Sequence, residues 1–182
     1  MAAVPALSFP PELLLAAQGI RVVFFDVDGV LTDGGLYLSA EGEMLKRFHI
    51  LDGLGLKLLQ QAGITPVVIT GRDSQPLRAR LAALGVTNVH YGTEDKAPAA
   101  EKTLQALGFD WPQAAAIGDD WPDLPVLRRC GFAAAPANAH AEVKAAASYV
   151  TTAGGGHGAA REDCDLLLGA SGRYAELLER YA

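Results

Sequence analysis

The sequence predicts an α/β fold in which one parallel sheet lies between two layers of helices. Short apolar runs typical of buried strands alternate along the chain with longer segments whose apolar residues recur at helical spacing. Connections between parallel strands are right-handed and place helices on both faces of the sheet. The expected architecture is a Rossmann-like, three-layer sheet, and the 182 residues are expected to form one domain over 1–182.

The first predicted elements are a short helix, a buried strand and a hairpin. Pro10-Pro11-Glu12 favours the first turn of a helix, and Gly19 ends it. Val22–Phe25 is wholly apolar, as expected for a strand covered on both faces. Residues 34–48 predict a β-hairpin inserted after this strand, because two extended segments flank the turn-forming residues 39–42. Its exposed edges make the hairpin a candidate for contacts between subunits.

The rest of the chain alternates between helix and strand patterns. Gly63, Gly85 and Gly108 each follow a helical pattern, at the position where glycine commonly ends a helix. We expect helices at 54–62, 74–84, 95–107, 121–130, 141–147 and 159–168, and strands at 64–70, 88–91, 114–117, 132–135 and 149–150. Residues 151–182 are the predicted C-terminal tail, which contains the last of these helices and ends in the segment 172–182.

The composition excludes several classes of protein. A net charge of −6 and a pI near 5.1 argue against non-specific nucleic-acid binding, which needs a basic surface. Cys130 and Cys164 have 33 residues between them and form no Cys-X-X-Cys motif, which predicts neither a disulfide framework nor a zinc site. Residues 1–11 lack a basic segment, and the apolar run at 13–15 is too short for a signal or membrane segment. We therefore expect a cytoplasmic protein without a membrane partner.

Polar side chains follow four successive strands of the predicted sheet. They are Asp26 and Asp28, then Thr70, Gly71 and Arg72, then Lys96, and finally Asp119, Asp120 and Asp123. The carboxyl ends of parallel strands meet at one edge, where open α/β sheets bind ligands. Paired carboxylates there repel each other unless a cation such as Mg²⁺ lies between them. Carboxylates, a hydroxyl and cations together suit Mg²⁺ and a phosphoryl group.

Other interpretations of the first motif remain open from these residues alone. Asp-X-Asp-Gly also occurs in calcium loops and in solvated acidic turns. The apolar strand before Asp26 and the apolar Val30-Leu31 after it argue against a calcium loop. Taken alone, Lys96 is also interpretable as a solvated helix residue, and Thr70-Gly71 as an ordinary strand exit. Four such coincidences at one edge of the sheet favour a functional site.

The order and spacing of these motifs resemble those of haloacid dehalogenase-like phosphatases. The resemblance rests on 26–30, Thr70, Lys96 and the run Gly118-Asp119-Asp120-X-X-Asp123. Residues 26–33, 48–55, 69–72, 117–120 and 154–162 further resemble the 3-deoxy-D-manno-octulosonate 8-phosphate phosphatases, over nearly the whole chain. That family implies a homotetramer in which hairpins meet at the interface and a C-terminal tail can reach a neighbouring active site.

The chain also predicts a fold without a cap, the separate lid domain found in many haloacid dehalogenase-like enzymes. Only 41 residues lie between Asp28 and Thr70, and the hairpin and one helix occupy most of them. A capless site is open to water and to bulky substrates, so neighbouring subunits would have to supply its walls. The resemblance also implies an acidic sugar phosphate as the substrate and a place in lipopolysaccharide precursor synthesis.

The expected reaction passes through an aspartyl-phosphate. Asp26 is the expected nucleophile, and Asp28 is the expected acid that protonates the leaving oxygen and then activates water. Asp26, the backbone carbonyl of Asp28 and Asp119 are the expected ligands of Mg²⁺, with Mn²⁺ or Co²⁺ as alternative metals.

The remaining strand-end residues are expected to hold the phosphate and support the metal. Thr70, the Gly71 amide and Lys96 are expected to bind the phosphate oxygens, with Asp120 and Asp123 orienting the metal's waters or Lys96.

The sugar is expected to lie in a cradle that the resemblance implies. Its residues are His49, Ile50, Leu51, Asp52, Gly53, Lys57, Arg72 and Arg80. Cations beyond Lys96 make physical sense, because an acidic sugar phosphate carries a carboxylate as well. Two departures bear on specificity, since the family often has arginine where this chain has Lys57 and His157.

Three alternatives are weighed against this prediction. The first is a phosphatase for a nine-carbon acid sugar 9-phosphate, such as a sialic acid or its deaminated analogue. The second is a phosphoryl-accepting receiver, disfavoured because a receiver places its acceptor aspartate on a later strand than its acidic pair. The third is a non-catalytic assembly module, disfavoured because every catalytic residue type is present.

Overall fold

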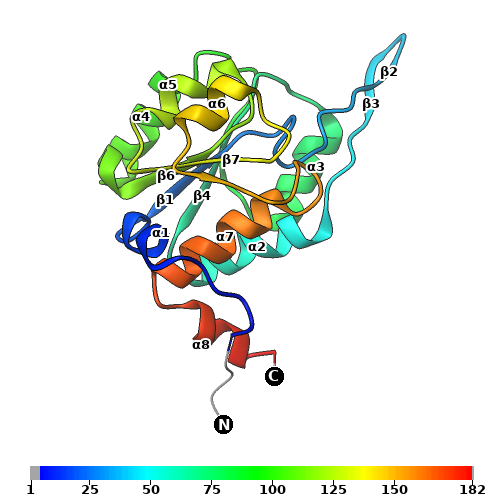
Figure 1. The fold of residues 1–182 in the computed structure, drawn as a ribbon. Helices are drawn as coiled ribbons and strands as arrows, with labels where there is room; N and C mark the ends of the chain where they lie inside the picture. Colours follow the sequence, from blue (N-terminus) through cyan, green and yellow to red (C-terminus); the bar gives the residue numbers. More distant parts are fainter. Residues whose placement is uncertain (1–4, 182) are drawn as a thin grey trace.

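The computed structural model describes residues 5–181 and has three layers (Figure 1). Six parallel strands form the central sheet in the order β5-β4-β1-β6-β7-β8. Their bounds are β1 Val22–Phe25, β4 Thr65–Ile69, β5 Asn88–His90, β6 Ala114–Ile117, β7 Phe132–Ala135 and β8 Tyr149–Val150. The predicted parallel α/β fold is confirmed.

Strand β1 lies in the middle of the sheet. Val22–Phe25 pairs with residues of β4 on one side and with Ala114–Ile117 of β6 on the other. After β1 the chain builds β4 and β5 outward, and it then returns to build β6, β7 and β8 on the opposite side. The strand order therefore reverses between β1 and β6, and ligands of open parallel sheets bind at such a reversal.

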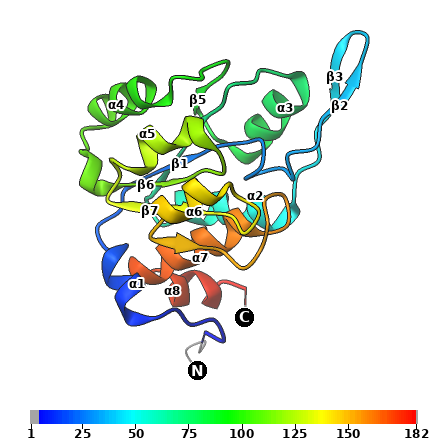
Figure 2. The ribbon, with the colours of Figure 1, turned by 45° about the horizontal axis from the view of Figure 1, so that its top comes forward.

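Helices cover both faces of the sheet (Figures 1 and 2). Helices α2, α3 and α7 pack on one face, where β1 contributes Val23 and Phe25. Helices α4, α5 and α6 pack on the other face, where β1 contributes Val22 and Phe24. The helix bounds are α1 Pro11–Ala16, α2 Ile50–Gln61, α3 Gln75–Leu84, α4 Lys96–Leu107, α5 Leu124–Leu127, α6 Ala141–Ala146, α7 Ala159–Ala170 and α8 Tyr174–Glu179.

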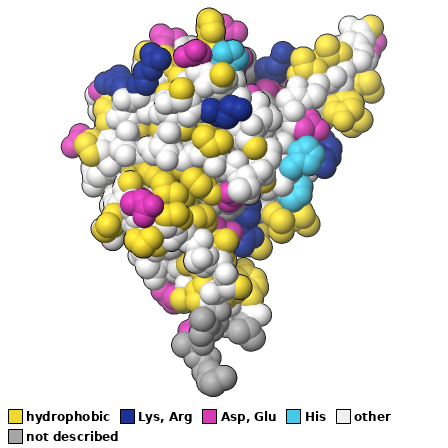
Figure 3. Space-filling view, in the orientation of Figure 1, with side chains coloured by type: hydrophobic (Ala, Val, Ile, Leu, Met, Phe, Trp, Pro, Cys, Tyr) yellow, Lys and Arg dark blue, Asp and Glu magenta, His cyan; other side chains and the backbone are white. Residues whose placement is uncertain are grey.

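The hairpin after β1 is confirmed and projects from the domain (Figures 1 and 2). Its strands are β2 Tyr37–Ser39 and β3 Gly42–Leu45, paired antiparallel. Leu38, Met44 and Leu45 are each more than 60% exposed in the isolated chain. Figure 3 shows hydrophobic side chains along the projecting arm. Within the described residues, the segment between β1 and β4 holds this hairpin and α2 and no lid domain, as predicted.

Helix α2 and the segment 121–130 differ most from the sequence prediction. Helix α2 begins at Ile50 rather than at residue 54, because tertiary packing overrides the low helix propensity of Gly53 and Gly55. A Cβ at Gly55 would lie 3.1 Å from Sγ of Cys164, so glycine lets α2 approach α7 closely. The predicted helix 121–130 is a 3₁₀ turn, Trp121–Asp123, followed by the short α5, because Pro122 and Pro125 lack the N–H that a longer helix needs.

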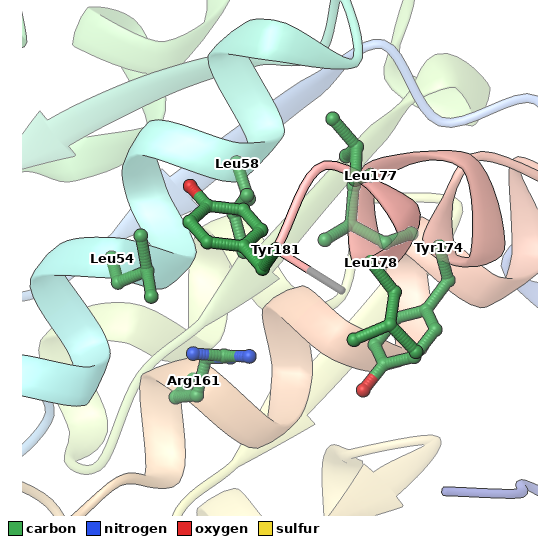
Figure 4. Close-up of a pocket in the computed structure, with 8 residues that line it drawn as sticks. Leu54, Leu58, Arg161, Tyr174, Leu177, Leu178 and Tyr181 are labelled. Atoms are coloured by element: carbon green, nitrogen blue, oxygen red, sulfur yellow. The ribbon is translucent and has the colours of Figure 1, made fainter. Parts of the chain in front are cut away.

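The segment 172–182 was predicted as a tail, but it contains the helix α8. Leu177 of α8 is 2% exposed, and its burial stabilises this helix. The spacing of apolar residues in the sequence did not indicate a helix here. Figure 4 shows the hollow that α8 forms with α2 and α7, lined by Leu54, Leu58, Arg161, Leu168, Tyr174, Leu177, Leu178 and Tyr181. Cys130 and Cys164 are free thiols. Across residues 5–181, no helix combines the length and apolar character needed to span a bilayer.

Candidate active site

The candidate site lies where β1 and β6 end. The Asp26 amide donates to the Ile117 carbonyl at 3.1 Å, so Asp26 continues β1 by one residue. The chain then turns at Gly29, whose φ of +96° is the left-handed conformation that glycine adopts readily. A Cβ at Gly29 would overlap the Asp119 carboxylate, so glycine here also admits the acidic loop after β6.

Three carboxylates converge at this edge of the sheet. Asp26, Asp119 and Asp123 each offer an oxygen, and these oxygens lie within 4.8 Å of one another. Burial and then the charge of Asp123 raise the pKa of Asp26 to about 6, although Lys96 opposes that shift. Burial and then the charges of Asp26 and Asp123 raise the pKa of Asp119 to about 8. Charged oxygens held this close fit a hard divalent cation, which relieves their repulsion.

Lys96 stands at the start of α4 and bridges two of these acids. Its Nζ donates to Oδ1 of Asp26 at 2.6 Å and to Oδ1 of Asp123 at 2.7 Å. The lysine side chain is 7% exposed, and its burial disfavours the charge. The two carboxylates outweigh that cost and raise the pKa of Lys96. We name Lys96 with Asp26 and Asp123 the Lys96 clamp; it keeps a cation beside the Asp26 carboxylate.

Asp123 and Asp120 order the loop after β6 in different ways. Oδ2 of Asp123 accepts hydrogen bonds from the amides of Asp119 at 3.0 Å and Asp120 at 3.3 Å. The exposed Asp120 accepts from the Trp121 amide at 2.8 Å and caps the following turn. Asp123 thus fixes both Lys96 and the backbone of Asp119, while the Asp120 side chain is used by the cap.

The end of β4 supplies Thr70, Gly71 and Arg72. Thr70 is fully buried, and its Oγ1 accepts from the Arg72 amide at 3.2 Å, which shapes the turn after the strand. Arg72 is half exposed, and its Nε lies 3.9 Å from Oδ2 of Asp28. Gly71 is exposed between them, so its amide lies on an accessible turn.

The Asp28 carboxylate pairs with cations outside the cluster of three acids. Its Oδ1 forms an ion pair with Lys46, which stands just beyond strand β3 of the hairpin. Lys46 also lies 2.8 Å from Oε1 of Glu43, and its side chain has no exposed surface. We name Lys46 with Asp28 and Glu43 the Lys46 clamp. Sequence reasoning missed it, because a lysine in an exposed hairpin is ordinarily solvated and only the i, i+3 spacing of Glu43 and Lys46 hinted at a pair.

The glycine-rich segment 154–158 packs against the loop that follows Asp28. The Gly156 amide donates to the Val30 carbonyl at 2.9 Å, and a Cβ at Gly155 would overlap the Gly29 carbonyl. His157 lies 3.3 Å from Nη1 of Arg47, which can only donate, so Nε2 of His157 is the acceptor. His157 therefore contacts the hairpin base rather than the carboxylate cluster.

The predicted sugar cradle is only partly assembled in the single chain. Arg80 donates to the His49 carbonyl at 3.2 Å, and a Cβ at Gly53 would overlap its guanidinium. The buried Asp52 instead accepts from the Arg161 amide at 2.8 Å, so its side chain faces α7. The other predicted members lie on exposed surface, namely Ile50, Leu51, Lys57 and, in large part, Arg72.

Comparison with known proteins identifies relatives that cover most of the chain. A family model described as haloacid dehalogenase-like hydrolase matches residues 86–162. The 3-deoxy-D-manno-octulosonate 8-phosphate phosphatase of Haemophilus influenzae is 44% identical over 156 residues, which cover 86% of this chain and 87% of the relative.

Two solved structures superpose over most of the chain. The Moraxella catarrhalis 3-deoxy-D-manno-octulosonate 8-phosphate phosphatase, in complex with magnesium, phosphate and KDO, has a TM-score of 0.91 and 37% identity, covering 94% of this chain and 98% of its own. The cobalt-bound Haemophilus influenzae phosphatase has a TM-score of 0.85 and 43% identity, covering 87% of this chain and 93% of its own.

Proposed function

The chain belongs to the 3-deoxy-D-manno-octulosonate 8-phosphate phosphatase family of haloacid dehalogenase-like hydrolases, and we propose that it hydrolyses that sugar phosphate to 3-deoxy-D-manno-octulosonate and phosphate, a step in lipopolysaccharide precursor synthesis. The observation that carries the proposal is the Lys96 clamp, a buried cation fixed against Asp26 beside two further carboxylates. This arrangement suits attack by a carboxylate on an anionic phosphate ester, because the cation offsets the repulsion between them.

The acidic cluster fits the magnesium or cobalt that the two solved relatives hold. Asp26, Asp119 and the backbone carbonyl of Asp28 are the proposed ligands, while Asp123 is engaged by Lys96 and two amides. When bound, the metal supplies positive charge at the carboxylates and the transferring phosphate. Mg²⁺ is the proposed physiological ion, with Mn²⁺ or Co²⁺ as replacements.

The first step is transfer of the phosphoryl group to Asp26. An oxygen of the Asp26 carboxylate attacks phosphorus in line, and the bond between phosphorus and the sugar oxygen breaks. The proton of Asp28, then a carboxylic acid, goes to the leaving sugar oxygen, which departs as a neutral hydroxyl. The products are the free sugar, an aspartyl-phosphate on Asp26 and an ionised Asp28.

The second step is hydrolysis of the aspartyl-phosphate. Asp28, now a base, takes a proton from water, and the resulting hydroxide oxygen attacks phosphorus. The bond between phosphorus and Asp26 breaks, which releases inorganic phosphate and restores both carboxyl groups. Thr70, the Gly71 amide and Lys96 are the proposed donors to the phosphate oxygens during both steps.

The sugar end of the substrate carries a carboxylate, and Arg72 and Arg80 are its proposed partners. The positions of the two arginines support this assignment. Arg72 is half exposed beside Asp28, and Arg80 donates to the His49 carbonyl. The partly buried His49 and the exposed Ile50, Leu51 and Lys57 are proposed to complete the cradle with a neighbouring copy. The exposed apolar hairpin supports assembly into a homotetramer, and two free thiols are compatible with a cytoplasmic protein.

Phosphate release from 3-deoxy-D-manno-octulosonate 8-phosphate tests this proposal, with Mg²⁺ or EDTA, beside a nine-carbon acid sugar phosphate and a hexose phosphate. We expect fast, metal-dependent release from the eight-carbon compound. Asp26→Asn should lower turnover by at least ~10³-fold, because the amide cannot act as the nucleophile. Release only from the nine-carbon compound would overturn the substrate, and full activity of Asp26→Asn would overturn the covalent route.

A further inference from the structure

The Lys46 side chain is buried, although it lies at the end of a hairpin whose apolar side chains are largely exposed. Its side chain has no exposed surface, while Met44 and Leu45 beside it are each more than 60% exposed. A lysine ammonium loses its hydration when it is buried, and only close partners compensate for that loss. The partners are Asp28 on one side and Glu43, with a side chain only 9% exposed, on the other.

The charges of the site are divided between two lysines. Lys96 contacts Asp26 and Asp123, whereas Lys46 contacts Asp28. Arg72 also faces Asp28, but at 3.9 Å and with a half-exposed side chain, so it restrains the carboxylate less. Lys46 is therefore the contact that determines where the Asp28 carboxylate points.

We propose that Lys46 is a positioning residue for proton transfer by Asp28 and that Glu43 fixes Lys46 in turn. This inference rests on the proposed function, in which Asp28 protonates the leaving oxygen and then activates water. The ion pair holds the Asp28 carboxylate outside the cluster of three acids that contains Asp26. The hairpin thereby contributes a residue to the active site of its own chain.

The experiment compares two phosphate esters in the first turnover. The leaving oxygen of the acid sugar phosphate needs a proton, whereas p-nitrophenol leaves p-nitrophenyl phosphate readily as its anion. In Lys46→Met, the first-turnover rate for the sugar phosphate should fall by roughly 30- to 100-fold, because positioned proton transfer contributes an effect of this order. The first-turnover release of p-nitrophenol and the KM for the sugar phosphate should stay within about threefold of wild type.

Further variants separate positioning from folding. Lys46→Met leaves Glu43 buried without a partner, so the double variant Lys46→Met with Glu43→Gln removes that unpaired charge and should show the same selective loss. Lys46→Arg, which keeps the cation, should cleave the sugar phosphate at least about threefold faster than Lys46→Met in the first turnover. Lys102→Met on the exposed side of α4 is the matched control and should behave as wild type.

Each other outcome overturns the inference. Equal loss on both esters would make Lys46 a general structural residue. A raised KM with unchanged kcat would make it a substrate ligand, and an unchanged rate would remove any role. Failure of the proposed function gives a different result, because the wild-type protein would then cleave p-nitrophenyl phosphate but no acid sugar phosphate. In that case a hexose phosphate replaces the acid sugar phosphate as the alkyl ester, and the Lys46 variants are compared on it and on p-nitrophenyl phosphate.

Discussion

The two lysine clamps of the site have the same composition but different foundations. Each places a buried ammonium between two carboxylates, Asp26 and Asp123 around Lys96, and Asp28 and Glu43 around Lys46. The first is built from strand and helix termini of the packed α/β core. The second depends on a two-stranded hairpin whose apolar side chains are exposed in the single chain.

This difference separates two parts of the chemistry. The residues proposed to hold the phosphoryl group belong to elements whose positions the core determines. The contact that orients the Asp28 carboxylate belongs to an element that an isolated chain stabilises poorly, because a lone hairpin is marginal in water. We therefore expect phosphoryl binding to be robust and proton transfer to be sensitive to the hairpin.

The largest expected effect comes from breaking the Lys96 clamp. Lys96→Met should lower turnover by roughly 10²–10³-fold on both the acid sugar phosphate and p-nitrophenyl phosphate, because Lys96 stabilises charge on the phosphoryl group whatever the leaving group is. Steady-state rates on both esters measure the effect, with Lys102→Met as the control. A loss confined to the sugar phosphate would contradict the division between the two clamps.

A smaller effect is expected from charges on the hairpin. Leu38→Asp combined with Leu45→Asp should break the proposed contacts between copies, since both leucines are more than 60% exposed in the single chain. Release of the hairpin should lower sugar-phosphate turnover by roughly ten- to a hundredfold, because a misplaced catalytic group costs this much. Light scattering and phosphate release measure the two effects.

Leu15→Asp provides the matched control for the hairpin variant. Leu15 is 65% exposed on α1, and its replacement should change neither assembly nor turnover. A dissociated hairpin variant with full activity would show that the Lys46 clamp forms without neighbouring copies.

The metal should bind more tightly as the pH rises. Without metal, Asp119 has a pKa of about 8 and Asp26 a pKa of about 6, so binding near pH 7 must release a proton. The Mg²⁺ dissociation constant should fall by roughly tenfold per pH unit between pH 6 and 8 and level off above that. Calorimetric titration across this range measures it, and a dissociation constant independent of pH would contradict the assigned ligands.

The smallest effect on turnover is expected from Asp163 in α7, a buried acid outside both clamps. Neither carboxylate oxygen has a hydrogen-bond partner, and burial raises its pKa to about 7. The unfolded chain loses this proton near pH 3.8, whereas the folded chain keeps it until about pH 7, so folding stability falls as pH rises through that window.

Replacing Asp163 should therefore stabilise the protein in a pH-dependent way. Asp163→Val should increase the free energy of unfolding by ~1–3 kcal/mol, more at pH 8 than at pH 5, because it removes an unpaired buried polar group. Urea unfolding at both pH values measures the change, with turnover unaffected. An equal gain at the two pH values would show that folding does not raise the pKa of Asp163.

Many of the elements were predictable because their patterns are local. Strands 114–117, 132–135 and 149–150 have the predicted bounds, since short apolar runs mark buried strands in a parallel sheet. The start of α2 and the existence of α8 were not predicted, because burial against α7 stabilises both and compensates for glycines or a weak pattern.

The order of the elements and the polar side chains that follow each strand were predictable from local sequence patterns. Those features depend on neighbouring residues, and the reversal of strand order brings Asp26, Lys96 and Asp119 together. The burial of the Lys46 side chain against Asp28, the orientation of Asp52 toward α7 and the packing of Gly155 on Gly29 arise only when the chain folds. Each of these contacts joins distant parts of the chain, such as Asp52 and Arg161, 109 positions apart, so no local pattern encodes it.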